Sequence, residues 1–541
     1  MTLTATSTLK QTEPAQETTQ EETPAAAQRP NRRAVMVSAV LTQLMIVLDL
    51  TIIAIALPRM QEDLGLTPSQ RPWAITAYTL ANGGLVLLGG RLTAVLGTRR
   101  AYWLGQTGFA TASLVAGMAA SFPVLVTARA AQGAFAALLG PTTLALLNSA
   151  FPEGPRRRRV FALFGATGGV GAAAGLLIGG ALTDWLDWRW SLYVNVPIAT
   201  IGFLVGLRGL PTANPRRNEP AFSDLSGLFL GCAACFSAVF GLDRAEQTSW
   251  GSASTIGWLA AAIVLALLFV IRERTASAPT LPLWIVTRPA RAASYVGAAT
   301  VGASQMGGAL YLTYYLQNHF GYSPLRTGIA FLPMIGALVA TAPTAGQFLL
   351  RRLGTRGVLI LGIGIEAAAF AFLSRIDVDS TYAAAVIPGL LIFGIGIGFV
   401  MPVAFNSGTR DIPASHIGLA SAVITVSQQI GASLGVALLA TYASRRVNMY
   451  VDEHAEQTKA QAMRALSQAQ ATPDSAAGQS IIARFTAEMA DHAQISAYSG
   501  GFLLMACILI AVGALLGALT APAALRRARA ALQARRSRRR D

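Results

Sequence analysis

Long apolar stretches, separated by short polar links, follow one another along the chain from residue 34 to residue 521. A helix needs about 20 apolar residues to cross about 30 Å of hydrocarbon, and each stretch is long enough to do so. The pattern therefore predicts an all-α polytopic membrane protein with fourteen transmembrane helices. Their expected bounds are residues 34–58, 73–95, 101–121, 123–150, 159–183, 190–210, 224–243, 253–271, 292–317, 325–350, 356–375, 382–405, 415–443 and 498–521.

Both ends of the chain and one internal loop depart from this pattern. Residues 1–32 are rich in Thr, Gln, Glu, Pro and Ala, which predicts a disordered tail. Residues 522–541 form a basic tail, and residues 444–497 form a long outer loop of mixed charge, expected to be a partly helical cap. No signal peptide is expected, because the first apolar run begins after Arg32 and Arg33 and is long enough to span.

The placement of the basic residues predicts the orientation of the spans. With the N-terminus inside, 30 of the 42 Lys and Arg residues fall in cytoplasmic segments and 11 in outer segments, five of them in the long loop. This asymmetry follows the positive-inside rule and predicts a multi-pass protein with both termini in the cytoplasm. The arginines at 156–159 and in the C-terminal tail are then topology signals and contacts with anionic membrane lipid, so no nucleic-acid partner is expected.

Composition supports the membrane assignment and narrows the chemistry. The chain is 53% hydrophobic and only 13% charged, whereas soluble domains are about 25% charged. Its three cysteines lie in apolar runs, and its four histidines lie in or beside polar links. This distribution argues against a disulfide framework, a metal site and a histidine proton relay.

An internal repeat predicts the architecture. Residues 89–99 align without gaps on residues 346–356, with six of eleven positions identical and an offset of 257 residues. The alignment places the link after span 2 on the link after span 10, so two extra spans must lie between two six-span halves. The expected divisions are 33–210, 211–288 and 289–521, with tails at 1–32 and 522–541. Repeated halves are typical of alternating-access transporters, whose substrate site lies between the halves.

Two ionisable residues lie deep within predicted spans. Asp49 interrupts the apolar run of span 1, and Arg129 is the one arginine placed inside the membrane, with Gln132 on the same helix face. An intramembrane acid is a functional candidate, because its proton affinity responds to the wetness and charge of its surroundings. We therefore predict that Asp49 couples transport to protons and that Arg129 tunes it. The alternative is a purely structural role for both residues.

Span 5 is rich in glycine. Gly171, Gly175 and Gly179 follow one another at four-residue spacing, which lets helix backbones approach closely. The run has no GK[ST] ending and lies in the bilayer, so it does not predict nucleotide binding. We expect these three glycines to form a closely packed, moving interface.

Amide and tyrosine side chains recur within the predicted spans. The group comprises Gln43, Asn82, Asn148, Gln305, Asn406, Gln428, Gln429, Tyr78, Tyr311, Tyr314 and Tyr315. Such a lining suits an amphipathic organic substrate better than an inorganic ion. The alternative is that these residues belong to an interfacial belt or to helix packing. Glu366 in span 11 is a second buried acid.

At these residues the sequence resembles the fourteen-span drug:proton antiporter branch of the major facilitator superfamily. The resemblance runs from about residue 34 to residue 521 and rests on several motifs in order. They lie at residues 48–58, 90–100, 129–133, 171–180, 188–190, 195–197 and 321–333. No single motif is decisive, but together they are specific.

The sequence departs from the family pattern at a few positions. Ala54 stands where the branch usually has Asn. Ala94 and Val95 replace an acid and a basic residue of the loop motif, which puts its charge latch in doubt. Leu176 replaces the proline of span 5, so a hinge there would depend on glycine alone.

The resemblance implies which helices surround the substrate. In the superfamily the first helix of each three-helix unit lines the cavity, which here means spans 1, 4, 9 and 12. The implied cavity residues are Gln43, Gln132, Gln305, Tyr311 and Asn406. Glu366 is not expected to line the cavity, because span 11 is peripheral in that scheme. The implied gating and packing residues are Arg91, Gly97, Arg99, Arg100, Gly171, Gly175 and Gly179.

The main hypothesis is a proton-coupled exporter of amphipathic organic compounds, drugs or antibiotics, in a bacterial plasma membrane. It needs no cofactor beyond the proton gradient, is not an enzyme, and is expected to act as a monomer. The bias of 40 Arg to 2 Lys suggests a GC-rich bacterial genome, so a dedicated exporter of one self-made antibiotic is an alternative. A non-transporting sensor or membrane enzyme is a third, without a catalytic cluster or signalling domain to support it.

Overall fold

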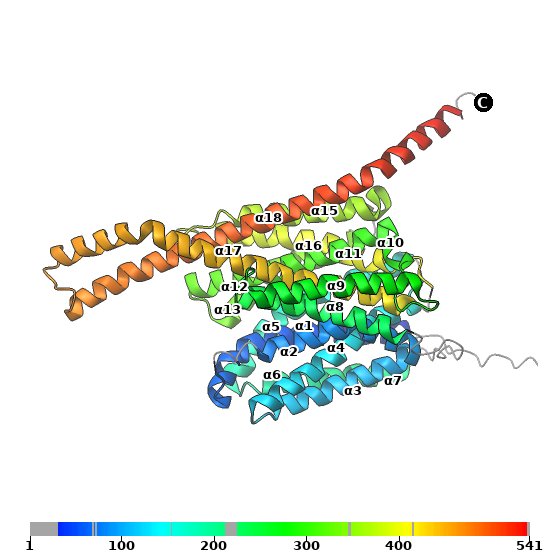
Figure 1. The fold of residues 1–541 in the computed structure, drawn as a ribbon, viewed down its shortest axis with the longest axis horizontal. Helices are drawn as coiled ribbons and strands as arrows, with labels where there is room; N and C mark the ends of the chain where they lie inside the picture. The colour runs from blue at the N-terminus through cyan, green and yellow to red at the C-terminus, as the bar shows by residue number, and fades with distance from the viewer. Residues whose placement is uncertain are drawn as a thin grey trace, which may run out of the picture.

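The computed structural model describes residues 31–67, 70, 73–152, 154–210, 224–344, 348–413 and 416–537. Within these residues all regular secondary structure is helical, which confirms the predicted all-α class. The helices pack side by side into an elongated bundle (Figure 1). Most of the predicted N-terminal tail, and the link at 211–223, lie outside the described residues.

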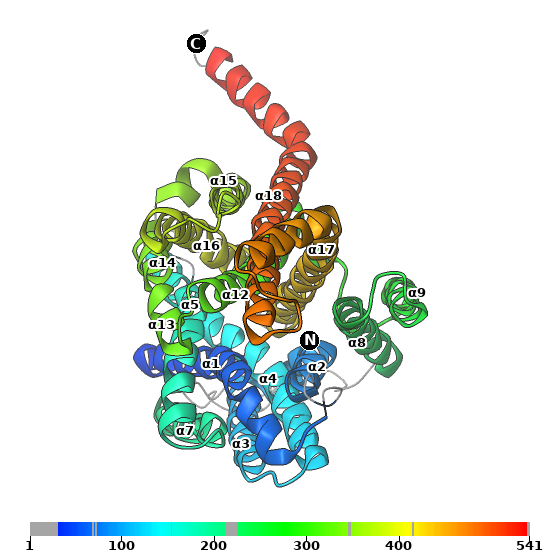
Figure 2. The same cartoon turned by 90° about the vertical axis from the view of Figure 1, so that its left-hand side faces the viewer.

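The first half of the chain forms one group of packed helices, drawn in blue and cyan in Figures 1 and 2. Its members are α1 (Arg32–Leu64), α2 (Trp73–Leu96), α3 (Thr98–Gly117), α4 (Phe122–Ala150), α5 (Pro155–Trp185), α6 (Trp190–Tyr193) and α7 (Asn195–Gly209). Two further helices, α8 (Leu225–Gln247) and α9 (Ala253–Thr275), form a hairpin at the edge of the bundle (Figure 2).

The last part of the chain forms the second group. Its members are α10 (Trp284–Thr287), α11 (Pro289–Ala303), η1 (Ser304–Gly308), α12 (Ala309–Tyr314), η2 (Tyr315–His319), α13 (Pro324–Ala330), α14 (Leu332–Thr344), α15 (Leu350–Leu373), η4 (Tyr382–Val386), α16 (Ile387–Gly408), α17 (Ile417–Gln468) and α18 (Ala476–Ser537). The segments η1, η2 and η4 are π-helical turns: η1 lies between α11 and α12, η2 ends that stack, and η4 leads into α16.

Each predicted span falls on a helix or on a stack of consecutive helices. Eleven helices in the described part of the chain are long and apolar enough to cross a membrane. The other predicted spans are α3, α5, and the stack from α11 to η2. A count of fourteen is therefore consistent with the structure.

The repeated loop sequence adopts the same backbone conformation in both halves. Gly97, which precedes α3, has φ +78°, and Gly354, exactly one repeat later, has φ +68°. Only glycine adopts this region without strain, so both copies of the loop need glycine at this position. Gly354 accordingly interrupts the helical φ/ψ values of α15.

The predicted outer loop at 444–497 is almost entirely helical. α17 continues to Gln468 and α18 begins at Ala476, so the two helices extend beyond the bundle as a hairpin (Figure 1). Residues 444–468 contain neither Gly nor Pro, and helix-forming residues allow α17 to continue. The expectation of a partly helical cap therefore understated the helix content.

Candidate functional site

A cluster of buried polar side chains lies in the core of the first half. It joins Asp49 of α1, Ser113 of α3, Arg129 and Gln132 of α4, and Asn195 of α7. Each of these side chains is at most 1% exposed. Burying a polar side chain without a hydrogen-bond partner costs free energy of folding, so the contacts among these side chains determine how much the cluster destabilises the protein.

Asp49 and Arg129 form an ion pair in this cluster. Nη1 of Arg129 donates to Oδ2 of Asp49 at 2.5 Å and to Oε1 of Gln132 at 2.9 Å. Nε of Arg129 donates to the carbonyl of Ala74 on α2 at 2.8 Å. The guanidinium lies 4.7 Å from the ring centroid of Tyr78, also on α2. Arg129 is thus fixed by α1 and α2 as well as by its own helix, α4.

The second carboxylate oxygen of Asp49 accepts two amide donors. Nδ2 of Asn195 lies 2.6 Å from Oδ1, and Nε2 of Gln132 lies 3.2 Å from it. Gln132 also donates to Oγ of Ser113 at 2.7 Å. Donors therefore reach both oxygens of the carboxylate, and one of these donors is a charged guanidinium. Binding a proton at Asp49 would weaken its hold on Arg129, Gln132 and Asn195 together.

Three atoms of this neighbourhood have no hydrogen-bond partner among the described residues. They are the hydroxyl of Tyr78, Nη2 of Arg129 and Oδ1 of Asn195. A buried donor or acceptor without a partner raises the free energy of the state that contains it. The cluster therefore keeps unused hydrogen-bonding capacity beside its ion pair.

Asp49, Arg129 and Gln132 are predicted site residues, whereas Asn195 and Ser113 are not. Asn195 belongs to the motif at residues 195–197. Ser113 gave no signal beyond being a small polar residue within span 3. Both reach the cluster from helices distant in sequence: Asn195 lies 146 residues from Asp49.

The predicted cavity residues do not form one group. Gln132 belongs to the ion-pair cluster, whereas Gln43 of α1 and Gln305 of η1 are half-buried elsewhere. Tyr311 of α12 is buried, and its ring lies 5.8 Å from that of Tyr498 on α18. Asn406 of α16 contacts an arginine of α5, as described below. Their roles in binding a substrate stay predictions.

The glycines of α5 lie against α1, the helix that carries Asp49. A Cβ at Gly171 would approach Val47 to 3.1 Å, and one at Gly179 would approach Ile52 to 3.1 Å. At Gly175 it would collide with the hydroxyl of Thr51. The four-residue glycine spacing therefore allows α5 to pack directly on the helix of the ion pair.

We expect Gly175→Ala to destabilise the folded protein by about 1–3 kcal/mol and to slow transport, because overpacking forces α1 and α5 apart. The carbonyl of Leu48 also lies 3.1 Å from the Cβ position and cannot rotate away as a side chain can. Thermal unfolding in detergent measures the effect. Gly336→Ala is the control, since nothing lies within 4 Å of that Cβ position. Equal stability of the two variants would contradict the packing argument.

The sequence matches the family model described as Major Facilitator Superfamily over residues 39–436. This chain belongs to the Major Facilitator Superfamily. It is 40% identical over 435 residues to the puromycin resistance protein pur8 of Streptomyces alboniger, covering 80% of this chain and 86% of that protein.

Two further relatives have similar coverage. The chain is 32% identical over 435 residues to the tetracenomycin C resistance and export protein of Streptomyces glaucescens, covering 80% of each. It is 31% identical over 413 residues to the multidrug resistance protein Stp of Mycobacterium tuberculosis, covering 76% of each.

Solved structures of the superfamily share the fold. The human organic anion transporter MFSD10 (TETRAN) matches with a TM-score of 0.55 and 14% identity, over 89% of this chain and 100% of that one. The proton:xylose symporter XylE, bound to 6-bromo-6-deoxy-D-glucose, matches with a TM-score of 0.55 and 11% identity, over 88% and 94%. The likeness concerns the fold alone.

The two halves of this major facilitator protein are joined through Arg157. Its Nε donates to Oδ1 of Asn406 at 2.9 Å, and its Nη2 donates to Oγ1 of Thr409 at 3.1 Å. Thr409 also donates to Oδ1 of Asn148 on α4 at 3.2 Å. These contacts join the start of α5 and the end of α4 to the end of α16. We call Arg157, Asn148, Asn406 and Thr409 the inter-half clamp.

The clamp changes the interpretation of the arginines at 156–159. Arg157 is only 7% exposed and binds the other half, so it does not act as a lipid contact, whereas its neighbour Arg156 is exposed. Close packing of α2 on α17 adds to the closure, since the backbones of Gly90 and Gly418 meet there. The bundle is therefore closed at the end where the predicted cytoplasmic arginines lie.

The other predicted gating residues surround the first repeated loop. Gly97 provides its left-handed backbone, and the guanidinium of Arg99 lies 4.5 Å from the ring of Trp103. Arg91 is half-buried near the end of α2, and Arg100 is exposed. Their part in gating stays a prediction.

We expect Arg157→Ala to open the closed end of the bundle. The change removes the donors that hold Asn406 and Thr409, so conformations with separated halves gain population. The distance between spin labels at the exposed positions Ser149 and Pro413 should lengthen or broaden. Arg156→Ala, in the same arginine run, should leave that distance unchanged. An unchanged distance in Arg157→Ala would contradict the clamp.

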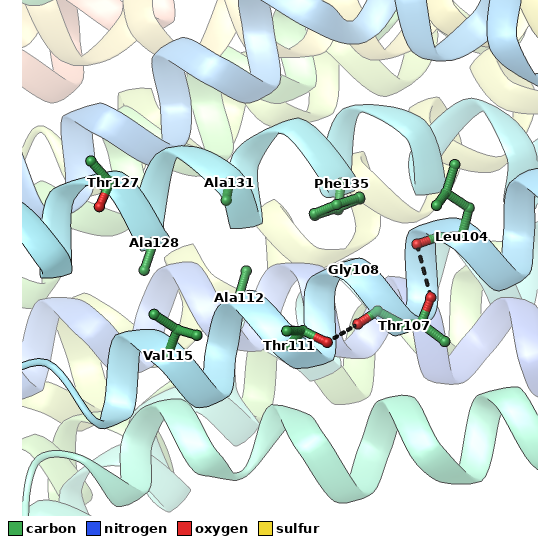
Figure 3. Close-up of a pocket in the computed structure, with 10 residues that line it drawn as sticks. All are labelled: Leu104, Thr107, Gly108, Thr111, Ala112, Val115, Thr127, Ala128, Ala131 and Phe135. Carbon is green, nitrogen blue, oxygen red and sulfur yellow. Dashed lines mark hydrogen bonds between the residues drawn. The ribbon is translucent and has the colours of Figure 1, made fainter.

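A pocket of about 480 Å³ lies between α3 and α4 (Figure 3). Its lining is mostly apolar and includes Leu104, Val115 and Phe135, and the first two side chains are more than 40% exposed. It contains none of the predicted cavity residues. Since the pocket opens on the outer surface of the bundle, it is a membrane-facing groove and not the site between the halves.

Proposed function

We propose that this chain is a proton-coupled exporter that moves amphipathic organic compounds, drugs or antibiotics, out across a bacterial plasma membrane in exchange for protons. The buried pair of Asp49 and Arg129 is the observation that carries the proposal. A carboxylate held by a fixed cation and two amides can exchange its partners for a proton. Resistance and export proteins at 31–40% identity support drug export as the direction.

The proposed cycle uses only groups of this chain. A proton reaching Asp49 neutralises the carboxylate and weakens its bonds to Arg129 on α4 and Asn195 on α7. Helices α1, α4 and α7 can then shift relative to one another, and the glycine face of α5 presents no side chains to obstruct a shift of α1. Release of the proton restores the pair. The gradient supplies the energy, and no cofactor takes part.

Orientation follows from the distribution of charge. The excess of Lys and Arg in the predicted inner segments supports an orientation with both termini in the cytoplasm. The hairpin of α17 and α18 projects from one end of the bundle, and the C-terminal end of α18 lies at the other end (Figure 1). This arrangement agrees with an outer hairpin and a cytoplasmic C-terminus. In it, the inter-half clamp closes the cytoplasmic entrance.

Transport by the purified protein in liposomes tests the proposal. Puromycin and the lipophilic cation ethidium serve as probes, with an imposed pH gradient and with or without a protonophore. Gradient-dependent transport of both compounds supports a broad exporter. Transport of puromycin alone supports the narrower alternative of an antibiotic-specific exporter, and transport that ignores the protonophore overturns proton coupling.

A further inference from the structure

A second acid is buried in the other half of the protein. Glu366 lies at the middle of α15 and is 0% exposed. Its Oε2 lies 2.6 Å from Oγ of Ser304, the first residue of the π-helical segment η1. Its Oε1 has no hydrogen-bond partner among the described residues. The proposed cycle at Asp49 does not use this carboxyl group.

Glu366 forms no ion pair within the part of the chain that the structure describes, and its hydrogen-bond partner Ser304 is neutral. From α16, Gly396 packs directly against the Glu366 side chain, and residues 387–408 contain no ionisable residue. One turn further along α15, Phe370 packs on Phe393 of α16 and Phe502 of α18. The titratable or charged groups on the packed segments are Arg291, Tyr295 and Tyr311 before and after η1, Arg351, Arg352 and Arg356 on α15, Arg375 just beyond its end, Tyr382 on η4, and Tyr498 and Cys507 on residues 498–521 of α18.

The three arginines of α15, and Arg375 two residues beyond its end, are too distant to pair with Glu366. Arg356, the nearest of the three, lies ten residues and about 15 Å away at 1.5 Å per residue, and Arg375 lies nine residues away in the other direction. An ionised carboxylate here would have one neutral partner and one bare oxygen, which is unfavourable in a low-dielectric interior. A neutral carboxylic acid suits the geometry better. In the structure the Ser304 hydroxyl is placed to donate to Oε2 of Glu366. A protonated Glu366 would instead donate to Oγ of Ser304, and the Ser304 hydroxyl would then donate to the carbonyl of Val301, 3.3 Å away.

The partner of Glu366 lies where the helical hydrogen bonding changes. The α-helical pattern of α11 gives way at Ser304 to the π-helical turn of η1, and such turns occur frequently at functional sites. Gln305, a predicted cavity residue, follows directly. On another face, Gly307 of η1 packs against Gly435 of α17. Any change of charge at Glu366 therefore acts on a segment that also contributes to the predicted cavity.

We propose that Glu366 is a second proton-binding site, in the C-terminal half, which holds a proton in this cytoplasm-closed conformation and is linked to the substrate path through Ser304 and η1. When α11 and η1 move away from α15, water reaches the carboxyl group, which gives its proton to that water. The carboxylate takes up a proton again when the interface closes. The protonation of Glu366 does not depend on the proposed function, whereas the exchange of its proton during transport rests on it.

Infrared spectroscopy of the purified protein tests the protonation directly, without any substrate. At neutral pH the wild type should show the C=O absorption of a buried carboxylic acid, and Glu366→Gln should lack it. Asp49→Asn should keep the band, and Ser304→Ala should shift it because one hydrogen bond is lost. No band that depends on Glu366 at neutral pH overturns the proposal. The glutamine amide has the size of the acid, so this variant keeps the packing.

Transport in liposomes tests the consequence. With puromycin as the probe, Glu366→Gln should still export the compound but move one proton fewer per molecule than the wild type. An unchanged proton count shows that the Glu366 proton never leaves, and this overturns its role as an exchanging site. If the wild type does not transport puromycin, the proposed function fails for that compound, whereas the infrared result still decides the protonation of Glu366.

Discussion

Replacing Asp49 by asparagine is expected to abolish proton-driven efflux while the protein stays folded in the membrane. The amide cannot bind and release a proton, and it leaves the charge of Arg129 buried without an ionic partner. If the unpaired charge of Arg129 raises the free energy of the rate-limiting conformation of the transport cycle by about 3 kcal/mol, transport slows by about 100-fold. Efflux of puromycin with and without a protonophore measures the loss.

Folding of the Asp49→Asn variant should survive for a structural reason. The asparagine oxygen still accepts from Arg129, and Arg129 keeps its bonds to the Ala74 carbonyl and to Gln132. Glu62→Gln is the matched control, since Glu62 lies on the same helix but is exposed. Normal export by Glu62→Gln with none by Asp49→Asn assigns the effect to the buried pair. Protonophore-sensitive export by Asp49→Asn would remove Asp49 from the coupling role.

Replacing Arg129 by glutamine should produce the largest loss of stability. The change leaves Asp49 as a buried carboxylate without a cation, and breaking a buried pair in this way costs about 3–5 kcal/mol. Glutamine is shorter than arginine and also loses the contact with Tyr78. Thermal unfolding in detergent should show a large drop in the midpoint temperature.

A double-mutant cycle separates the ion pair from other losses. Combining Arg129→Gln with Asp49→Asn removes both charges, so the double variant should be more stable than Arg129→Gln alone. Purely additive losses would show that the two residues are not energetically coupled. Arg129→Lys should also lose transport, although it keeps the positive charge. The planar guanidinium of arginine bonds to Asp49, Gln132 and Ala74 at once, and a lysine ammonium group cannot reproduce that geometry.

Much of the fold was predictable because membrane crossing depends on local properties. Span length and apolarity can be counted along the chain, and the predicted spans coincide with helices. The repeated loop was visible in sequence because its glycines, Gly97 and Gly354, are required by the backbone itself. The hairpin at 444–497 was expected to be only partly helical because it is polar, although polarity does not prevent a helix from continuing outside the membrane.

The candidate site was predictable only in part. Asp49 and Arg129 stood out because a charge in an apolar run is expensive wherever the helix packs. Asn195 and Ser113 did not stand out, since small polar residues are common in membrane helices. Asn406 was predicted from its span to face the cavity, whereas in the structure its amide binds Arg157, 249 residues earlier in the chain.

The sequence by itself determined the class of the protein, the apolar helices long enough to span a membrane, the repeated loop and the two charged residues, Asp49 and Arg129, that are buried. These follow from hydropathy, length and periodicity, which act within single helices. Only the tertiary structure decided that Asn195 completes the Asp49 site, that Arg157 joins the halves, and that Glu366 meets a π-helical turn. Those contacts join helices far apart in sequence, and they depend on how each helix is rotated and tilted against its neighbours.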